Sequence, residues 1–144
     1  MDYSQSHFLV STDQNRLDIP YMHQCLSEKT YWATGRLYET VERSVRNSMC
    51  FGMYDTEKDR QIGFARIITD YITFAWLADV FIDPDYRGQG LGKWLVECVT
   101  NDPELNPIRR FLLATKDAEE LYTKYGFTPL PEGYRYMQRM QDVK

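Results

Sequence analysis

The order of apolar and polar positions predicts strands and helices from the first residues onward. A short, partly apolar block at His7–Ser11 predicts a strand, and the polar residues 12–16 predict the turn after it. Asp18 stands where it can cap a helix, with Pro20 in the first turn, where a missing N–H group is tolerated. The buried face of that helix is expected to consist of Met22, Cys25 and Leu26.

A second helix and a group of strands are predicted next. Residues 27–35 contain aromatic residues and a glycine and are expected to link two helices. Apolar residues then recur every fourth position, at 37, 41 and 45, which predicts a helix over residues 37–47. Strands are predicted at Met49–Tyr54, Gln61–Thr69 and Phe74–Ile82. The polar turn at residues 55–60 makes the first two of them a hairpin.

The C-terminal half alternates between helices and strands. An apolar stripe at positions 91, 94, 95, 98 and 99 predicts a helix that ends at about Thr100, and Arg110–Ala114 is expected to form a strand. Asp117 and Glu120 stand at the spacing of a capping box, so another helix is predicted from about residue 118 to Gly126. A final strand is predicted at Tyr134–Met140.

These elements predict one mixed α/β (α+β) domain over residues 1–144. Its central sheet is expected to be mostly antiparallel, with about six or seven strands flanked by about four helices. The strand-to-helix-to-strand step from residue 74 to residue 114 should be a right-handed parallel crossover.

A glycine-rich turn joins the strand that ends at Ile82 to the helix that begins near Leu91. It reads Asp-Pro-Asp-Tyr-Arg-Gly-Gln-Gly-Leu-Gly-Lys over residues 83–93. Free N–H groups and the positive end of the helix dipole make such a turn a seat for an anion, most often a phosphate. The spacing fits neither a nucleotide P-loop, because Arg87 replaces the first glycine and Trp94 the Ser or Thr, nor the Gly-x-Gly-x-x-Gly fingerprint of dinucleotide sites.

The pattern that fits is Arg/Gln-x-x-Gly-x-Gly/Ala, filled by residues 87–92. It resembles the coenzyme A pyrophosphate loop of the GNAT superfamily of N-acetyltransferases. About thirty residues further on, Leu121-Tyr122-Thr-Lys-Tyr-Gly126-Phe127 resembles the second hallmark of that family. The order of elements matches as well, so the resemblance covers nearly the whole chain and implies a GNAT-like fold.

The resemblance implies transfer of an acetyl group from acetyl-CoA to a primary amine of a small molecule or peptide, by direct attack in a ternary complex. It does not fix the amine. The alternative is a non-catalytic acyl-CoA-binding sensor or regulatory module, which would need the glycine turn but neither Tyr122 nor Asp79. An interaction domain with a degenerate loop is a weaker alternative, against which the intact residues 87–92 argue.

The resemblance also assigns expected roles to individual residues. The pyrophosphate would be held by backbone N–H groups of Gly88, Gln89, Gly90, Leu91 and Gly92, with positive charge from Arg87 and Lys93. The bulged strand that pairs with the pantetheine arm corresponds to Val80, Phe81 and Ile82, where a free N–H would polarise the thioester carbonyl. Tyr122 corresponds to the tyrosine that protonates the departing thiolate; its alternative role is that of a core aromatic.

Asp79 is the one charged residue within an otherwise apolar strand. A buried charge is costly unless it is paired or functional. By alternation, Asp79 is expected on the face of Leu77 and Phe81. Its functional role would be that of a general base or of an anchor for the substrate ammonium. The structural alternative is an ion pair, for instance with Arg66. Tyr31 and Trp32, in the linker that overhangs the acceptor site in the family, are either an aromatic wall for the substrate or a core contact.

Charge and composition narrow the partners. The formal net charge of -4, without a basic face, argues against nucleic acid as the partner. The 3 cysteines have no Cys-x-x-Cys spacing, and His7 and His23 alone make no metal site, so no metal is expected. The sequence has no segment that resembles a signal peptide and no apolar run of 18 residues, so a cytoplasmic protein that does not associate with a membrane is expected. Exposed strand edges leave a homodimer open.

Overall fold

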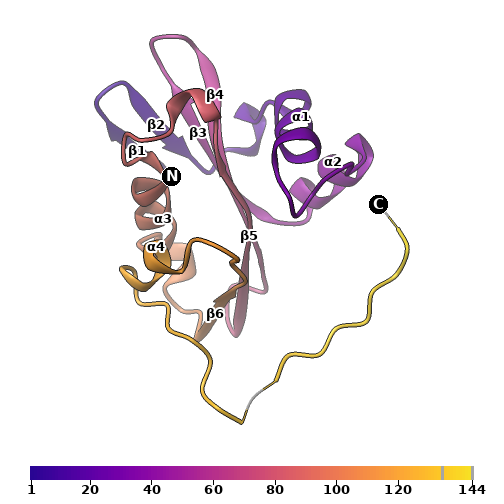
Figure 1. Ribbon diagram of the computed structural model, residues 1–144. Helices are drawn as coiled ribbons and strands as arrows, with labels where there is room; N and C mark the ends of the chain where they lie inside the picture. Colours follow the sequence, from indigo (N-terminus) through magenta and orange to yellow (C-terminus); the bar gives the residue numbers. More distant parts are fainter. Residues whose placement is uncertain (134, 144) are drawn as a thin grey trace.

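The computed structural model describes residues 1–133 and 135–143 and contains one 6-stranded sheet in the order β1-β2-β3-β4-β5-β6 (Figure 1). The strands are Asp2–Gln5 (β1), Phe8–Ser11 (β2), Met49–Asp55 (β3), Arg60–Thr69 (β4), Phe74–Ile82 (β5) and Arg110–Leu113 (β6). The α-helices are Ile19–Lys29 (α1), Tyr38–Arg46 (α2), Leu91–Thr100 (α3) and Glu119–Thr123 (α4). Short 3-10 turns are Gln14–Arg16 (η1), Pro84–Tyr86 (η2) and Pro103–Leu105 (η3). The predicted mixed, mostly antiparallel α/β fold is confirmed.

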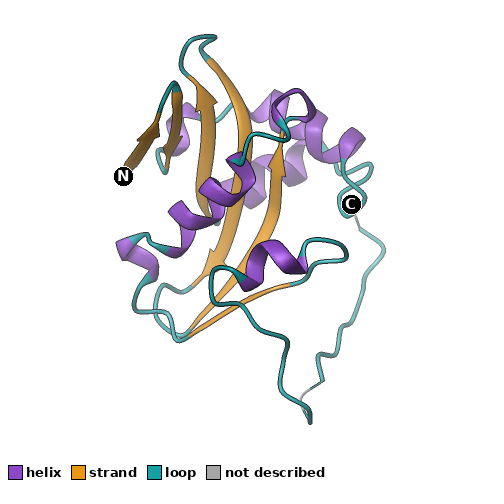
Figure 2. Ribbon diagram, turned by 60° about the vertical axis from the view of Figure 1, so that its left-hand side comes forward, coloured by secondary structure: helices purple, strands orange, loops and turns teal. Residues whose placement is uncertain are grey.

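Helices cover both faces of the sheet. Helices α1 and α2 lie on one face, and α3 and α4 lie on the other (Figures 1 and 2). The α1/α2 layer packs on Cys50, Phe64 and Phe81 of the sheet. The α3 layer packs on a larger apolar cluster that includes Phe51 and Leu77. Burial of these two clusters removes apolar area from water and is the main term that stabilises the fold.

The parallel pair β5–β6 sets the position of the site. All other neighbouring strands are antiparallel, whereas β5 and β6 run parallel, with Leu77 opposite Leu113 at the end of their pairing. The predicted parallel crossover through α3 is therefore confirmed. Because β6 ends at Leu113 while β5 continues to Ile82, the two strands part, and this edge of β5 has no strand partner among the described residues.

The helices largely follow the sequence prediction. The Asp18 Oδ1 atom accepts a hydrogen bond of 3.1 Å from the Tyr21 N–H and caps α1. Leu37, expected on the buried stripe of the second helix, is instead 57% exposed because it stands at the N-cap, before the first helical turn. The predicted capping box at Asp117 is wrong as well: Ala118 occupies the N-cap, and its N–H donates to Thr115 Oγ1.

Two strand predictions were incomplete or wrong. β1 was not predicted, because its sequence Asp-Tyr-Ser-Gln has only one half-buried residue. Of the strand expected at Tyr134–Met140, residue 134 lies outside the described residues, and residues 135–140 form no strand. Pro129 and Pro131 precede this segment and cannot donate to a sheet ladder, and the chain leaves the body of the domain after them (Figure 1).

A β-bulge in β5 reverses the alternation on which the faces were predicted. Ala78 lies opposite Arg66 and Phe81 opposite Phe64, so Asp79 and Val80 together face the single residue between. Asp79 has a left-handed φ of 55°. Leu77 therefore packs in the α3 layer and Phe81 in the α1/α2 layer. The prediction that Asp79 shares a face with both residues is wrong, because an extra residue in a strand shifts the side-chain period.

No helix within the described residues is long and apolar enough to span a membrane.

Candidate active site

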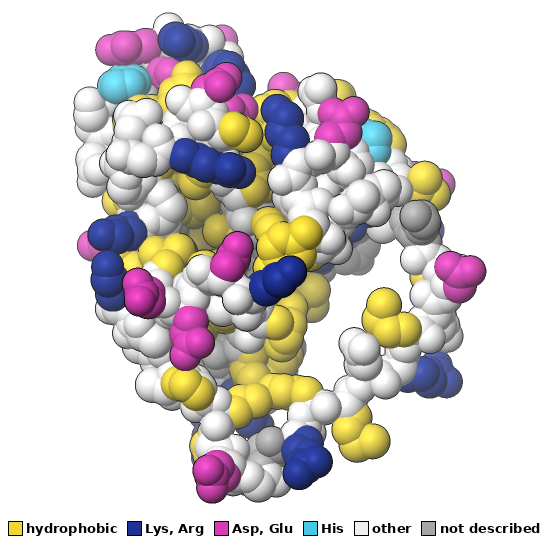
Figure 3. Space-filling view, in the orientation of Figure 1, with side chains coloured by type: hydrophobic (Ala, Val, Ile, Leu, Met, Phe, Trp, Pro, Cys, Tyr) yellow, Lys and Arg dark blue, Asp and Glu magenta, His cyan; other side chains and the backbone are white. Residues whose placement is uncertain are grey.

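A cleft of about 1130 Å³ opens where β5 and β6 separate. One wall is the exposed edge of β5 with the glycine-rich turn after it, and the opposite wall is the loop after β6 with the start of α4. Residues 29–32 and Arg36 of the α1–α2 connection close the third side. Figure 3 shows hydrophobic side chains along a hollow in the middle of one face, with Lys and Arg side chains at its border. Divergence of two parallel strands is a common way for α/β folds to make a ligand site.

The glycine turn has the backbone conformation that an anion site requires. Gly88 and Gly90 have φ values of 84° and 77°, and a Cβ atom added at either would meet no atom within 4 Å. Gly90 is the N-cap of α3 and offers no side-chain hydrogen bond, so the first N–H groups of the helix keep their capacity for a ligand. A Cβ at Gly92 would touch only Ile82 Cγ1, at 3.9 Å. The fold itself therefore does not require glycine at position 92.

Two carboxylates hold the glycine turn in place. The Tyr86 hydroxyl donates a hydrogen bond of 2.6 Å to Asp55 Oδ2 at the end of β3. Asp83 Oδ2 accepts bonds from the Tyr21 hydroxyl at 2.8 Å and from Arg60 Nη2 at 2.9 Å. The bond from Tyr86 lowers the pKa of Asp55 below its ordinary value, so this carboxylate stays ionised at neutral pH. Both anchors precede Arg87, whose Nε donates to the Ile82 carbonyl at 3.4 Å.

The carboxylate of Asp79 lies on the α1/α2 side of the bulge and is fully engaged. Its Oδ2 atom is 2.7 Å from Arg36 Nη1 and 2.9 Å from Arg66 Nε, and its Oδ1 accepts a bond of 3.1 Å from Trp32 Nε1. The ion pair with Arg66, which is the structural role inferred from the sequence, is thus present. The network ties the α1–α2 connection to the bulge.

Tyr122 projects from α4 toward the cleft and is nearly buried, at 9% exposure. Burial raises the pKa of its phenol above the ordinary value, with smaller contributions from Tyr31 and Asp117. Its ring packs edge-on against Phe127, with 5.9 Å between centroids. Tyr122 is therefore both a core aromatic and a neutral phenol at the cleft, and the two roles inferred from the sequence do not exclude each other.

Tyr31 and Trp32 line the cleft and are not core residues. They are 55% and 42% exposed and make an edge-on pair with 5.0 Å between ring centroids. The ammonium of Lys116, on the opposite wall, lies 5.4 Å from the centre of the Tyr31 ring. An exposed aromatic pair at the mouth of a cleft is suited to contact a ligand.

Most residues predicted for the site line this one cleft. The lining includes Tyr31, Trp32, Asp79, Val80, Phe81, Ile82, Arg87, Gly88, Gly90, Leu91, Gly92 and Tyr122. The side chain of Gln89 instead donates to the Tyr86 carbonyl at 3.5 Å, and Lys93 is exposed on α3; neither is part of the lining. Lys29, Arg36 and Lys116 also line the cleft and were not predicted. No periodicity marks them, because each stands at a helix end or in a loop.

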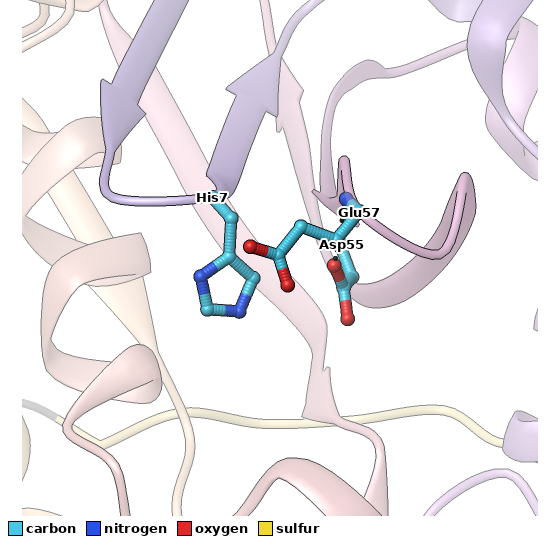
Figure 4. A group of neighbouring side chains, drawn as sticks. All are labelled: His7, Asp55 and Glu57. Atoms are coloured by element: carbon cyan, nitrogen blue, oxygen red, sulfur yellow. Dashed lines mark hydrogen bonds between the residues drawn. The ribbon is translucent and has the colours of Figure 1, made fainter.

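One group of potential metal ligands lies elsewhere among the described residues. The ligand atoms of His7, Asp55 and Glu57 lie within 4.8 Å of one another, between the β1–β2 turn and the end of β3 (Figure 4). Asp55 already accepts bonds from Tyr86 and from the N–H groups of Glu57 and Lys58. Its burial is explained by these bonds, which close the β3–β4 turn and hold η2.

Comparison with known proteins identifies the family. The model of the acetyltransferase (GNAT) domain matches residues 46–129. A protein from Gibberella zeae that is named as an acetyltransferase is 30% identical over 141 residues, which cover 85% of this chain and 80% of that protein. A crystal structure from Xanthomonas campestris pv. campestris, assigned to the GNAT family, is 44% identical with a TM-score of 0.89 and covers 96% of both chains.

The chain therefore belongs to the GNAT family of acetyltransferases and is an acyltransferase. A GNAT family acetyltransferase from Elizabethkingia anophelis, solved with acetyl-CoA bound, has a TM-score of 0.64. It is 16% identical and covers 88% of this chain and 80% of that one, so this likeness concerns the fold alone.

Proposed function

We propose that the protein transfers an acetyl group from acetyl-CoA to a primary amine of a small molecule or peptide, by direct attack within a ternary complex. One observation carries the proposal: the glycine turn, the bulge of β5 and the phenol of Tyr122 all line the same cleft. An anion seat, a free strand edge and a proton donor are the parts that acetyl transfer from a long phosphorylated thioester requires.

The donor site fits coenzyme A. The N–H groups at Gly88, Gly90 and Gly92 can hold a pyrophosphate, and Arg87 supplies a positive charge beside them. The fold does not require glycine at position 92, and the absence of a side chain there leaves room for the pyrophosphate to approach the backbone closely. The pantetheine arm, which carries amides, can pair with the edge of β5 that β6 leaves free. Bound acetyl-CoA would supply a reactive thioester at the bulge. The Elizabethkingia anophelis protein, which shares this fold, is solved with acetyl-CoA bound.

Residues of this chain can assist the transfer at two points. Asp79 and Val80 share one partner residue on β4, and an extra residue in a bulge leaves backbone groups unpaired. We assign the N–H of Val80 to polarisation of the thioester carbonyl. We assign the hydroxyl of Tyr122 to protonation of the departing thiolate, because its raised pKa keeps it protonated at neutral pH.

Asp79 receives a positioning role in this proposal. Three donors from Trp32, Arg36 and Arg66 occupy its two oxygens. A carboxylate held in this way fixes the geometry of the bulge and of the wall formed by residues 31 and 32, and it acts on the reaction through them.

The location proposed for the protein is the cytoplasm. Its cysteines, Cys25, Cys50 and Cys98, are all buried and free, as expected in a reducing compartment.

A screen tests the proposed function directly. The purified protein is incubated with acetyl-CoA and separate panels of amino acids, amino sugars, polyamines, aminoglycosides and peptides, and the release of free coenzyme A thiol is measured. Calorimetric titration with coenzyme A runs in parallel. Acetylation of at least one class of amine is expected. Tight coenzyme A binding without acetylation of any amine would support the binding-module alternative, and absence of binding would reject both.

A further inference from the structure

The α1/α2 side of the cleft holds more positive than negative charge. Arg36 and Arg66 both contact the same oxygen of Asp79, at 2.7 Å and 2.9 Å. One carboxylate carries one negative charge and neutralises only one of two guanidinium groups. Among the described residues, Arg66 Nη1 also donates a hydrogen bond to the neutral hydroxyl Ser48 Oγ, at 3.2 Å. The cluster of Asp79, Arg36 and Arg66 therefore keeps a net charge of about +1.

This excess charge is sheltered from water. The side chains of Arg36 and Arg66 are only 21% and 13% exposed. A cation that is largely sheltered from solvent without a full counter-charge is destabilised, as a buried cation is when it loses its acidic partner. All three groups line the cleft, so a ligand there can supply the missing negative charge.

The charged side chains at the mouth of the cleft are also mainly positive. Lys29 at the end of α1 and Lys116 after β6 both line it, and both are exposed. Besides Asp79, the acidic residue in the described lining is Asp117, which is exposed and lies beside Lys116 in the sequence. Outside the glycine turn, the lining therefore contains two lysines and two arginines but only two carboxylates among the described residues. The cleft is thus locally positive, although the whole chain carries a formal charge of -4. A local field opposite to the net charge favours anionic ligands.

We infer that the acceptor amine also carries a carboxylate or phosphate group, which pairs with Arg36 and Arg66. The inference rests on the proposed function and adds the class of substrate. Guanidinium groups bind both anions through paired hydrogen bonds, so the shared chemistry is an anionic amine. The same cations favour loss of a proton from the substrate ammonium, and only the neutral amine can attack a thioester. Polyamines and aminoglycosides, which are cations, are poor substrates on this account.

Matched acceptor pairs test the inference. An α-amino acid is compared with its amide, and phosphoethanolamine and glucosamine 6-phosphate are compared with ethanolamine and glucosamine. We expect kcat/KM to be at least tenfold higher for the anionic member of one pair, and the carboxylate and phosphate arms tell which anion is recognised. Equal or faster acetylation of neutral or cationic amines would overturn the inference while leaving acetyl transfer intact.

Binding gives a readout that does not depend on turnover. Each pair is titrated calorimetrically into the protein saturated with coenzyme A. Tighter binding of an anionic member supports the inference, whereas equal binding within every pair, or binding of none, overturns it. Failure of the proposed function is recognised separately, because it means that no amine is acetylated at all.

A variant locates the effect. Arg36→Gln removes the more exposed guanidinium and leaves the pair between Asp79 and Arg66. It is expected to raise KM for the anionic acceptor at least tenfold, to remove the preference over the neutral member, and to leave KM for acetyl-CoA unchanged. Arg43→Gln, on α2 with a side chain that is 74% exposed and outside the cleft, is the matched control. An unchanged preference in Arg36→Gln would also overturn the inference.

Discussion

Asp79 and Arg66 are joined across the bulge of β5 by a contact of 2.9 Å between Oδ2 and Nε. Arg66 lies opposite Ala78 on β4, so the ion pair spans the point at which the ladder shifts register. Asp79 holds a left-handed φ of 55° there, a conformation that costs a non-glycine residue free energy. The ion pairs with Arg66 and Arg36 offset this cost and connect the bulge to the α1–α2 wall.

Replacement of Asp79 should affect both stability and acceptor binding. Asp79→Ala would leave two sheltered guanidinium groups without their carboxylate, so we expect the free energy of unfolding in urea to fall by about 3 kcal/mol. Asp79→Asn keeps a hydrogen-bond acceptor, and asparagine tolerates the left-handed region, so its free energy of unfolding should fall by less. This variant should also raise KM for the amine. Asp59→Asn is the control, because Asp59 has a φ of 50° and is exposed. Equal stability of both variants and wild type would argue against this role.

The sequence predicted the fold well where one face of an element is continuously apolar. Helices α1 and α3 and strands β3 to β5 satisfy that condition and were predicted close to their bounds. β1 has no buried residue, and the C-terminal segment, although it contains tyrosine and methionine residues, has no partner strand in the described chain. Periodicity reports which face could be buried; it does not report what covers that face.

The site was predicted only in part for a different physical reason. The glycine turn and Tyr122 stand in short contiguous motifs, which a sequence displays directly. The bulge inverted the predicted face of Asp79, because its extra residue is set by the pairing with β4. Arg36 reaches Asp79 across 43 positions of sequence, and no local pattern marks such a contact.

A negative charge in the anion seat should abolish donor binding. Gly92→Asp places a carboxylate in the first turn of α3, where the helix dipole favours it, so the fold should be retained. The same charge would repel the pyrophosphate, and we expect coenzyme A affinity to fall at least a hundredfold by calorimetry. Gly92→Ala adds bulk without charge, and its methyl group would meet only Ile82, at 3.9 Å. Its affinity for coenzyme A should fall by less than that of Gly92→Asp. Wild-type affinity in Gly92→Asp would remove this turn from the donor site.

Removal of the Tyr122 hydroxyl should lower the rate of turnover and spare donor binding. Tyr122→Phe keeps the ring that packs on Phe127 and deletes the proton donor. General-acid catalysis contributes about 10²–10⁴-fold, so kcat should fall by about that factor while the dissociation constant of coenzyme A stays constant. Tyr125→Phe, just beyond the end of α4 and outside the lining of the cleft, is the control and should retain wild-type kcat. A Tyr122→Phe enzyme with undiminished kcat would show that the phenol serves packing alone.

The pH dependence of turnover should reflect the raised pKa of Tyr122. Burial raises this pKa, so the phenol stays protonated to a higher pH than an exposed tyrosine, whose pKa is about 10. As pH increases from 7, kcat should therefore rise or level off with deprotonation of the amine, and it should not decline from loss of the acid below about pH 10. The profile of Tyr122→Phe should lack any decline above that value. A decline near pH 8 in the wild type alone would contradict the assignment.

Tyr86 should couple the stability of the glycine turn to pH. Tyr86→Phe deletes the 2.6 Å bond to Asp55, and loss of one donor to a buried carboxylate should lower the free energy of unfolding by about 1–3 kcal/mol at pH 7. Because this bond lowers the pKa of Asp55, its stabilisation is present above the unfolded value of about 3.9 and is lost as pH falls through the lower folded value. Urea titrations at pH 7 and about pH 3 should therefore show a smaller acid-induced loss in the variant than in the wild type. Tyr71→Phe, at an exposed tyrosine, is the control. If acid lowers the free energy of unfolding equally in the wild type and in Tyr86→Phe, Asp55 is not held by Tyr86.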